Sequence, residues 1–216
     1  MAIITKITRI LFRHNCLLCR QSADDVVCES GITCLFASMN SKKHQVELDS
    51  QYDYYYMFEY CDEIKYLLKR FKFQKDLLVA DVLIKLINMW WDSFAVNHLS
   101  DVDAIAVVPI HRYRYLYRGF NQSEVLMQGL SYHIFKPTTF DRYKRVKYAK
   151  AQAKSSKKSR ISNIDGAFEM TKTIRVKHLL VFDDVLTTGS TLKEFIKTIN
   201  PRGNIEKISI VTLVRA

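Results

Sequence analysis

Apolar residues in the middle of the chain recur at the spacings of alternating strands and helices. The segment "YDYYYMFEY" (52–60) has the aromatic enrichment of a strand, which favours packing within a sheet over a platform for stacking ligands. In "DEIKYLLKRFKF" (62–73) and "DLLVADVLIKLINMWW" (76–91), apolar residues lie three and four apart, which predicts two helices. The segment "DAIAVVPI" (103–110) is short and rich in β-branched residues, as is typical of a strand buried on both faces.

The second half of the chain repeats this order. The segment "NQSEVLMQGLSYHIF" restarts a helical period, and Asn121 and Glu124 have the spacing of a capping box at its start. Further on, the pattern predicts a strand, a helix and a last strand at 178–184, 191–199 and 207–214. Strands and helices in this order predict an α/β fold, with a parallel sheet flanked by helices and right-handed crossovers.

The composition divides the chain near residue 45. Residues 1–45 contain four of the five cysteines and end in the polar stretch "SMNSKKHQ", whereas residues 46–216 carry the predicted sheet. We therefore expect a small cysteine-rich unit at 1–45 and one α/β domain at 46–216.

The 216 residues, 48% apolar and 25% charged, have the composition of a globular protein. No apolar run approaches the roughly 18 residues of a transmembrane helix. The start, "MAIITKITRILF", is interrupted by Lys6 and Arg9 and has no small-residue cleavage site, so we do not expect a signal peptide. These features favour the cytoplasm, and they leave open a peripheral association with the inner face of the membrane.

The formal net charge of +11 favours polyanionic partners, and the positive charge is clustered. Residues 142–160 hold nine Lys or Arg and no acid, and we expect a mobile basic loop at about 142–165. A second patch, "HRYRYLYR" at 111–118, alternates tyrosine with mostly arginine. If this patch is extended, one face presents rings and the other cations, a combination that grips single-stranded nucleic acid. The alternatives are a solvated loop at 142–160 and, at 111–118, a connection between a strand and a helix whose tyrosines only pack.

The predicted nucleic-acid contacts belong to these two patches and are Arg112, Tyr113, Arg114, Tyr115, Arg118, Lys144, Arg145, Lys147 and Lys150.

The segment "HLLVFDDVLTTGSTLKEF" (178–195) combines a buried strand, two acids and a turn into a helix. Ligands of parallel α/β sheets bind beyond the carboxyl ends of the strands, where Asp183 and Asp184 are expected. Backbone N–H groups at a turn containing Gly189, together with the following helix dipole, form an anion cradle. Because adjacent carboxylates can accept hydrogen bonds from vicinal hydroxyls, the segment predicts a site for a 5-phosphorylated ribose. The alternative is a capped helix after a strand, with Thr191 and Glu194 as a capping box.

The sequence "LLVFDDVLTTGST" resembles the phosphoribosyl pyrophosphate (PRPP) signature of type I phosphoribosyltransferases. With "VVPIHRYRYLYRGFNQSEVL", "YCDEIKYLLKRFKF", "ISNIDGAFEM" and the N-terminal cysteines, the chain is identified as a member of the ComF family, associated with DNA uptake in naturally competent bacteria. The resemblance implies a type I phosphoribosyltransferase-like parallel sheet with a small N-terminal zinc-knuckle unit. It also implies that Asp183 and Asp184 contact ribose hydroxyls, directly or through Mg²⁺, and that loop 142–165 closes over the ligand. The residues expected to hold the 5-phosphate are Thr187, Thr188, Gly189, Ser190 and Thr191, and Arg112 is expected to contact pyrophosphate.

The cysteines Cys16, Cys19, Cys28 and Cys34 form the pattern C-x2-C-x8-C-x5-C. In a cytoplasmic chain this pattern favours a structural zinc site over disulfides, and the alternative is a metal-free knuckle of buried thiols. Relatives more often close the site with a second C-x2-C, so His14 is an alternative ligand. Cys61, in an apolar setting, is expected to be a core residue and not a nucleophile.

Three functions remain open at this level. The first is a ComF-type protein of natural competence that binds PRPP and takes part in the uptake or cytoplasmic handling of transforming single-stranded DNA, with other competence or recombination proteins as candidate partners. The second is a metabolic phosphoribosyltransferase that transfers ribose-5-phosphate from PRPP to a base or amine. The third is a PRPP-sensing module without turnover. The sequence identifies no catalytic residue and no acceptor.

Overall fold

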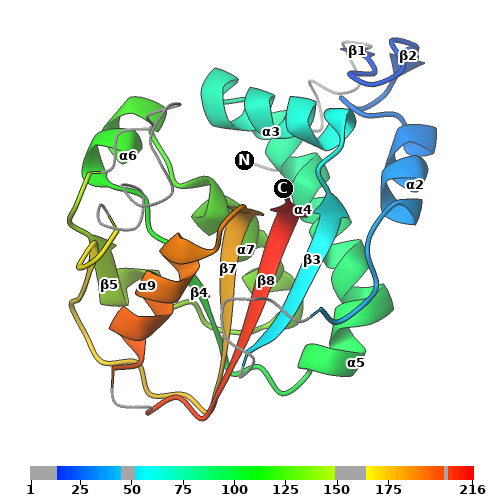
Figure 1. Cartoon of the computed structure of the whole chain (residues 1–216). Coiled ribbons are helices and arrows are strands. Elements are labelled where there is room, and N and C mark those ends of the chain that lie inside the picture. Colours follow the sequence, from blue (N-terminus) through cyan, green and yellow to red (C-terminus); the bar gives the residue numbers. More distant parts are fainter. Residues whose placement is uncertain (1–13, 45–51, 149–163, 202–203) are drawn as a thin grey trace.

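A four-stranded parallel sheet forms the centre of the protein. The computed structural model describes residues 14–44, 52–148, 164–201 and 204–216 (Figure 1). The strands of the sheet, in spatial order, are β3 (Asp53–Glu59), β8 (Lys207–Arg215), β7 (His178–Leu186) and β4 (Ala104–Val107). All three pairings are parallel, which confirms the α/β fold expected from the alternating pattern.

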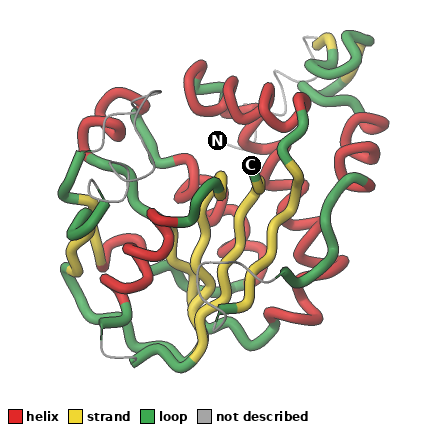
Figure 2. Tube along the Cα trace, viewed as in Figure 1, coloured by secondary structure: helices red, strands yellow, loops and turns green. Residues whose placement is uncertain are grey.

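Helices cover both faces of this sheet (Figures 1 and 2). One face packs against α3 (Asp62–Gln74), α4 (Leu77–Trp90) and α7 (Gln122–Ile134). The other face packs against α9 (Ser190–Ile199) and the hairpin of β5 (Tyr143–Arg145) and β6 (Phe168–Met170), which follows η2 (Phe140–Arg142). Alternate residues of each central strand enter the two cores: Leu180 and Phe182 join the first and Leu179 and Val181 the second. This double burial explains why these strands are continuous apolar runs.

The tyrosines of β3 are structural. Tyr54, Tyr55 and Tyr56 are all buried, and the Tyr54 hydroxyl lies 2.9 Å from Thr212 Oγ1 on β8. The aromatic run is therefore part of the sheet packing, as its composition predicted.

The apolar period after residue 76 continues further than expected. Helix α4 passes through a π-helical turn, η1 (Trp91–Ala95), into the short helix α5 (Val96–Leu99). Trp90 Nε1 donates a hydrogen bond to the carbonyl of Asn40, at 2.8 Å, and so ties the N-terminal segment to α4.

The N-terminal cysteine-rich segment packs on the main domain. It contains a short hairpin of β1 (His14–Asn15) and β2 (Ser22–Ala23), followed by α2 (Glu29–Ala37). Ile32 and Leu35 of α2 are buried in the same apolar cluster as α3 and α4. The boundary predicted at residue 45 falls outside the described residues.

Two segments differ from the local structure that was considered for them. Residues 111–118 are not extended: they form helix α6 (Arg112–Arg118), which begins where His111 Nδ1 accepts the Tyr113 N–H and ends at Gly119 with φ of 87°. The loop expected at 142–165 starts instead as strand β5, whose Lys144 pairs with Glu169 of β6. Residues 149–163, including Lys150, lie outside the described part of the chain.

Within the described residues, no helix combines the length and the apolar character that crossing a membrane requires.

Candidate functional site

The two adjacent acids lie within strand β7, which continues for two residues past the tip at which they were expected. Strand β8 extends alongside as far as Arg215, so the ladder continues and Asp183 pairs in register with Thr212. Both carboxylates are partly buried at the carboxyl end of the sheet, which is the edge where parallel α/β folds bind ligands. The sequence thus predicted this edge of the sheet correctly and ended the strand two residues early.

A lysine from a distant helix pairs with the second acid. Lys72 Nζ of α3 lies 2.6 Å from Asp184 Oδ2, and the two side chains are only 17% and 16% exposed. The sequence did not predict this contact, because Lys72 is one of several cations in "KYLLKRFKF" and its spacing does not indicate its partner.

The acid pair is held near its ionisation point. Burial raises the pKa of the Asp183 carboxyl to about 7, and the charge of Asp184 adds to this effect. The Asp184 N–H, which donates to Asp183 Oδ1 at 2.9 Å, and the charges of Lys72 and Arg145 act in the opposite direction. The pair therefore gains its second negative charge close to neutral pH.

Two arginines lie within electrostatic reach of the acids. Burial lowers the pKa of Arg118, on α6, and neighbouring Arg114 lowers it further, whereas the charge of Asp184 raises it. Arg145, on β5, is perturbed in the same way, with Asp183 as its acidic neighbour. Figure 1 shows α3 and α6 at the end of the sheet toward which β7 and β8 point. The sequence predicts Arg118 and Arg145 as contacts of nucleic acid. In the structure, the charge of Asp184 acts on Arg118 and the charge of Asp183 acts on Arg145.

The turn after β7 has features that could hold an anion. Gly189 has φ of 68°, a left-handed conformation that favours glycine, and it is the N-cap of the ten-residue helix α9. Thr188 Oγ1 and Ser190 Oγ lie 3.0 Å apart, and Thr187 and Thr188 are exposed. Asp183, Gly189 and Thr191 line one small cavity together. Hydroxyls, backbone N–H groups and the helix dipole thus converge beside the acids, as an anion requires.

The alternative explanation of this segment, a capping box, is wrong. Glu194 does not reach back to the start of α9; its Oε1 accepts the N–H of Gly166 at 2.8 Å. The capping box predicted for α7 forms in part: Asn121 accepts the Ser123 N–H, and Glu124 Oε1 accepts from the Asn121 side chain.

Arg112 lies apart from the turn. It is the exposed first residue of α6 and lines a second, larger cavity with the connection that follows β4. Sequence reasoning did not predict that Glu124, Phe140 and Tyr143 line this cavity, because Glu124 was assigned only to a helix cap and Phe140 and Tyr143 fit no motif.

Three of the four N-terminal cysteines form a cluster that could hold a metal ion such as zinc. The sulfur atoms of Cys16, Cys19 and Cys28 all lie within 4.8 Å of one another, and the Cys19 and Cys28 sulfurs are 3.7 Å apart. Two sulfurs on a tetrahedral zinc ion are separated by about 3.8 Å.

The surroundings of this cluster stabilise thiolates. Burial raises the pKa of the Cys16 thiol, but backbone N–H groups, among them those of Leu18 and Cys28, lower it to a net value of about 6. The Cys28 sulfur accepts the N–H of Gly31.

Cys34 is not brought into this cluster. Cys28 caps α2, and Cys34 lies six residues further along that helix, a rise of about 9 Å. The side chain of His14 lies outside the described part of the chain. Cys61 is partly buried against the core at the start of α3, as expected.

Comparison with known proteins finds similarity to phosphoribosyltransferases. A family model described as phosphoribosyl transferase domain matches residues 121–216. A hypoxanthine phosphoribosyltransferase from Staphylococcus aureus is similar with a TM-score of 0.40 and 16% identity, over 63% of this chain and 64% of that one. By the family match, residues 121–216 belong to a phosphoribosyltransferase domain, and the sheet that they complete is parallel.

Its relatives define the family more narrowly. Competence protein F of Haemophilus influenzae is 33% identical over 73% of this chain and 70% of its own length. DNA utilization protein YhgH of Escherichia coli K12 is 29% identical over 63% of this chain, and the match spans 60% of YhgH, less than two thirds of it. The chain belongs to the ComF family of competence proteins.

Proposed function

We propose that this ComF-type protein binds PRPP with Mg²⁺ at the end of β7 and takes part in the uptake or cytoplasmic handling of transforming single-stranded DNA. The observation that carries the proposal is the convergence of the acid pair, the turn at 187–191 and the start of α9 at one edge of the sheet. The names of the relatives, competence protein F and DNA utilization protein, support the second part.

The chemistry of the site suits PRPP in each of its parts. The turn offers N–H and hydroxyl donors to a 5-phosphate, and Asp183 and Asp184 offer acceptors to the ribose hydroxyls. Carboxylate oxygens are also the ligands that Mg²⁺ prefers, so the same pair fits the cation, which would offset the charge of the pyrophosphate when bound. Lys72, Arg118 and Arg145 add positive charge around a ligand that carries several negative ones.

Mg·PRPP should stabilise the folded protein through the hydroxyls of the turn. At a ligand concentration of about 100 times the dissociation constant, we expect the melting temperature to rise by about 5–10 °C. A Thr188→Val/Ser190→Ala double variant, which removes the two facing hydroxyls, should lose most of this rise. Differential scanning fluorimetry measures the rise in melting temperature. The matched control is Thr198→Val, at the far end of α9, which should keep the full rise. An equal rise in the double variant would exclude the turn as the phosphate site.

The exposed face of α6 supports contact with single-stranded DNA. Tyr113, Tyr115 and Tyr117 are 67%, 47% and 76% exposed, so they do not pack into the core as the structural alternative required. They lie on a helix that also carries Arg112 and Arg114. Rings and cations on one short helix can stack on bases and bind phosphates, although not with the alternation that an extended strand would give.

Binding of single-stranded DNA should be dominated by phosphate contacts. For about five neutralised phosphates, affinity for an oligothymidylate should fall about 100-fold between 50 and 200 mM salt. Tyr117→Ala should weaken binding by about fivefold or more through lost stacking. Fluorescence anisotropy measures both effects, with Tyr132→Ala, a 71% exposed tyrosine on α7, as control. Salt-independent binding, or equal losses in the two variants, would contradict the proposed surface.

We also propose that the cysteine cluster holds a structural zinc ion. Three sulfurs at zinc-like separations, with N–H donors aimed at them, fit three ligand positions of a tetrahedral site. Purified protein should contain about one zinc per chain by elemental analysis. Cys16→Ser should lose most of the zinc and the order of the N-terminal segment, whereas Cys34→Ser should retain both. Zinc-free wild-type protein, or loss of zinc in the Cys34 variant, would contradict this ligand set.

A further inference from the structure

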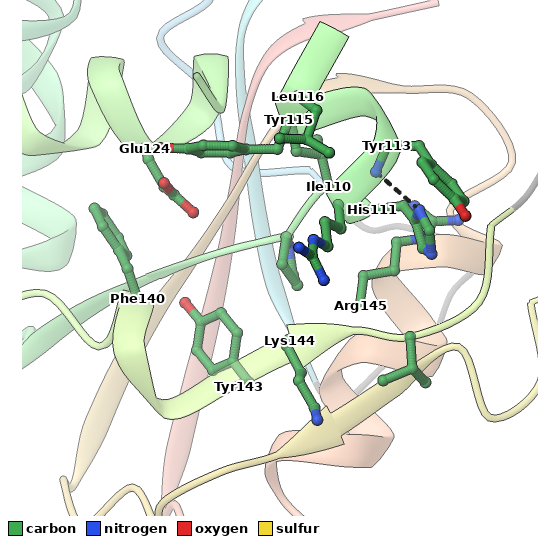
Figure 3. Close-up of a pocket in the computed structure, with 13 residues that line it drawn as sticks. Ile110, His111, Tyr113, Tyr115, Leu116, Glu124, Phe140, Tyr143, Lys144 and Arg145 are labelled. Atoms are coloured by element: carbon green, nitrogen blue, oxygen red, sulfur yellow. Dashed lines mark hydrogen bonds between the residues drawn. The ribbon is translucent and has the colours of Figure 1, made fainter. Parts of the chain in front are cut away.

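A cavity of about 840 Å³ lies beside the connection between β4 and α6 (Figure 3). It shares no lining residue with the small cavity of the 187–191 turn. Its walls come from α6, the first turn of α7, η2 and β5. The volume lies within the range of small-molecule binding sites.

One end of this cavity has flat aromatic walls. Phe140 and Tyr143 line it from η2 and β5, and Tyr115 lines it from α6. The Tyr143 ring is fixed, because its hydroxyl accepts the Val107 N–H at 2.9 Å and its ring packs edge-on against Phe195. Rings held in this way favour a planar, aromatic ligand.

A partly buried carboxyl group, that of Glu124, lies beside these rings. Glu124 points into the same space, toward Tyr143 (Figure 3). Its Oε1 accepts a hydrogen bond from Asn121 Nδ2 at 3.1 Å, and among the described residues Glu124 forms no ion pair. Burial raises the pKa of Glu124, which makes an uncompensated charge costly and a ligand N–H donor favourable at this point.

Cations lie at the other end of the cavity. Lys144 is largely exposed, where it pairs with Glu169 at 3.2 Å, and Arg145 lies over the Phe168 ring. Arg112 is exposed at the start of α6. A ligand whose flat ring enters beside Glu124 would therefore carry negative charge at its outer end.

We propose that this cavity binds the base of a nucleotide, with guanine preferred, its phosphate lying near Lys144 and Arg112. An ionised carboxylate accepts two adjacent donors, and guanine is the base whose pairing edge presents two adjacent donors, N1–H and the 2-amino group. Adenine and cytosine offer one amino group beside an acceptor, and thymine one N–H between two acceptors. Single-stranded nucleic acids are read in this way, by stacking unpaired bases and binding their pairing edges. This proposal depends on the proposed DNA binding in one respect only: that the bound base belongs to single-stranded DNA.

The test compares oligonucleotides that differ in one base, using the full-length protein at low salt. We expect an oligothymidylate with one central guanine to bind about tenfold more tightly than oligothymidylate alone. Glu124→Gln should abolish this preference and leave the stabilisation by Mg·PRPP unchanged, which also reports that the variant is folded. Glu63→Gln, an exposed acid on α3, should retain the preference. Tyr115→Ala, on the surface of α6, is a second variant that should reduce it.

The outcomes separate this proposal from the proposed function. Salt-dependent binding without a guanine preference, or a preference that survives Glu124→Gln, overturns the pocket while DNA binding stands. Failure of every oligonucleotide to bind contradicts the DNA-handling function instead. In that case, binding of dGMP in preference to dAMP, dCMP and dTMP, lost in Glu124→Gln, would still support the pocket with a free nucleotide as its ligand, and absence of this binding would overturn it.

Discussion

An Asp183→Asn variant of the free protein is expected to be more stable than the wild type at about pH 8, by about 2 kcal/mol. Burial and the charge of Asp184 raise the pKa of Asp183 in the folded state to about 7, from an ordinary value of 3.8. Between pH 3.8 and about pH 7, the folded state binds more protons than the unfolded state. The free energy of unfolding of the wild type therefore falls as the pH rises through this range. Asparagine cannot ionise and avoids that cost.

Urea unfolding at about pH 5 and pH 8 measures this difference. The gain in the free energy of unfolding should be larger at the higher pH, where the wild-type carboxylate is charged. Asp62→Asn, at a 98% exposed position on α3, should show no such dependence. A variant that is less stable than the wild type at both pH values would mean that Asp183 serves the fold, and that its ionisation carries no cost. The expected gain is typical of a residue kept for binding at the expense of stability.

Replacing Lys72 with methionine should shift the ionisation of the acid pair to higher pH. The Lys72 ammonium contacts Asp184 at 2.6 Å and lowers the pKa of Asp183. Without it, the carboxylates lose their closest positive charge, and the pH at which Mg·PRPP binding reaches half its maximum should rise by about one unit. At neutral pH this corresponds to about tenfold weaker binding, which should recover as the pH is raised. The broken ion pair should also lower the free energy of unfolding by about 1–2 kcal/mol, since both side chains are largely buried.

Two further variants on the same helix control this experiment. Lys72→Arg keeps the charge and should retain the wild-type pH midpoint, whereas Lys69→Met removes an exposed charge of α3 and should change little. A midpoint that is the same in Lys72→Met and in the wild type would show that this lysine only stabilises the fold.

The sequence predicted those strands and helices whose own residues show the hydrophobic pattern of their type. Strands β4, β7 and β8 are buried on both faces, so apolar residues dominate each of them. Helix α6 was missed because alternating tyrosine and arginine has the period of a strand, whereas its helical form depends on the His111 cap and on Gly119. Strand β5 has three residues and is defined by its pairing with β6, which lies beyond the undescribed segment.

In the candidate site, too, the sequence predicted residues that are contiguous in the chain and missed those that only folding brings together. The acids and the turn of β7 are contiguous in the chain, so one motif contained them. Lys72 and Arg118 reach the acids from α3 and α6, and only the folded chain brings these helices to the end of β7. For the cysteines, spacing alone did not show that the helix starting after Cys28 carries Cys34 away from the cluster.

The most direct measurement is a calorimetric titration of Mg·PRPP into the wild-type protein and into an Asp183→Asn/Asp184→Asn double variant at about pH 8, where the wild-type pair is ionised. The proposed site predicts saturable binding of one PRPP per chain in the wild type and in the Asp62→Asn control, and its loss in the double variant. Absence of binding to the wild type at millimolar PRPP would contradict the central claim, and so would undiminished binding to the double variant.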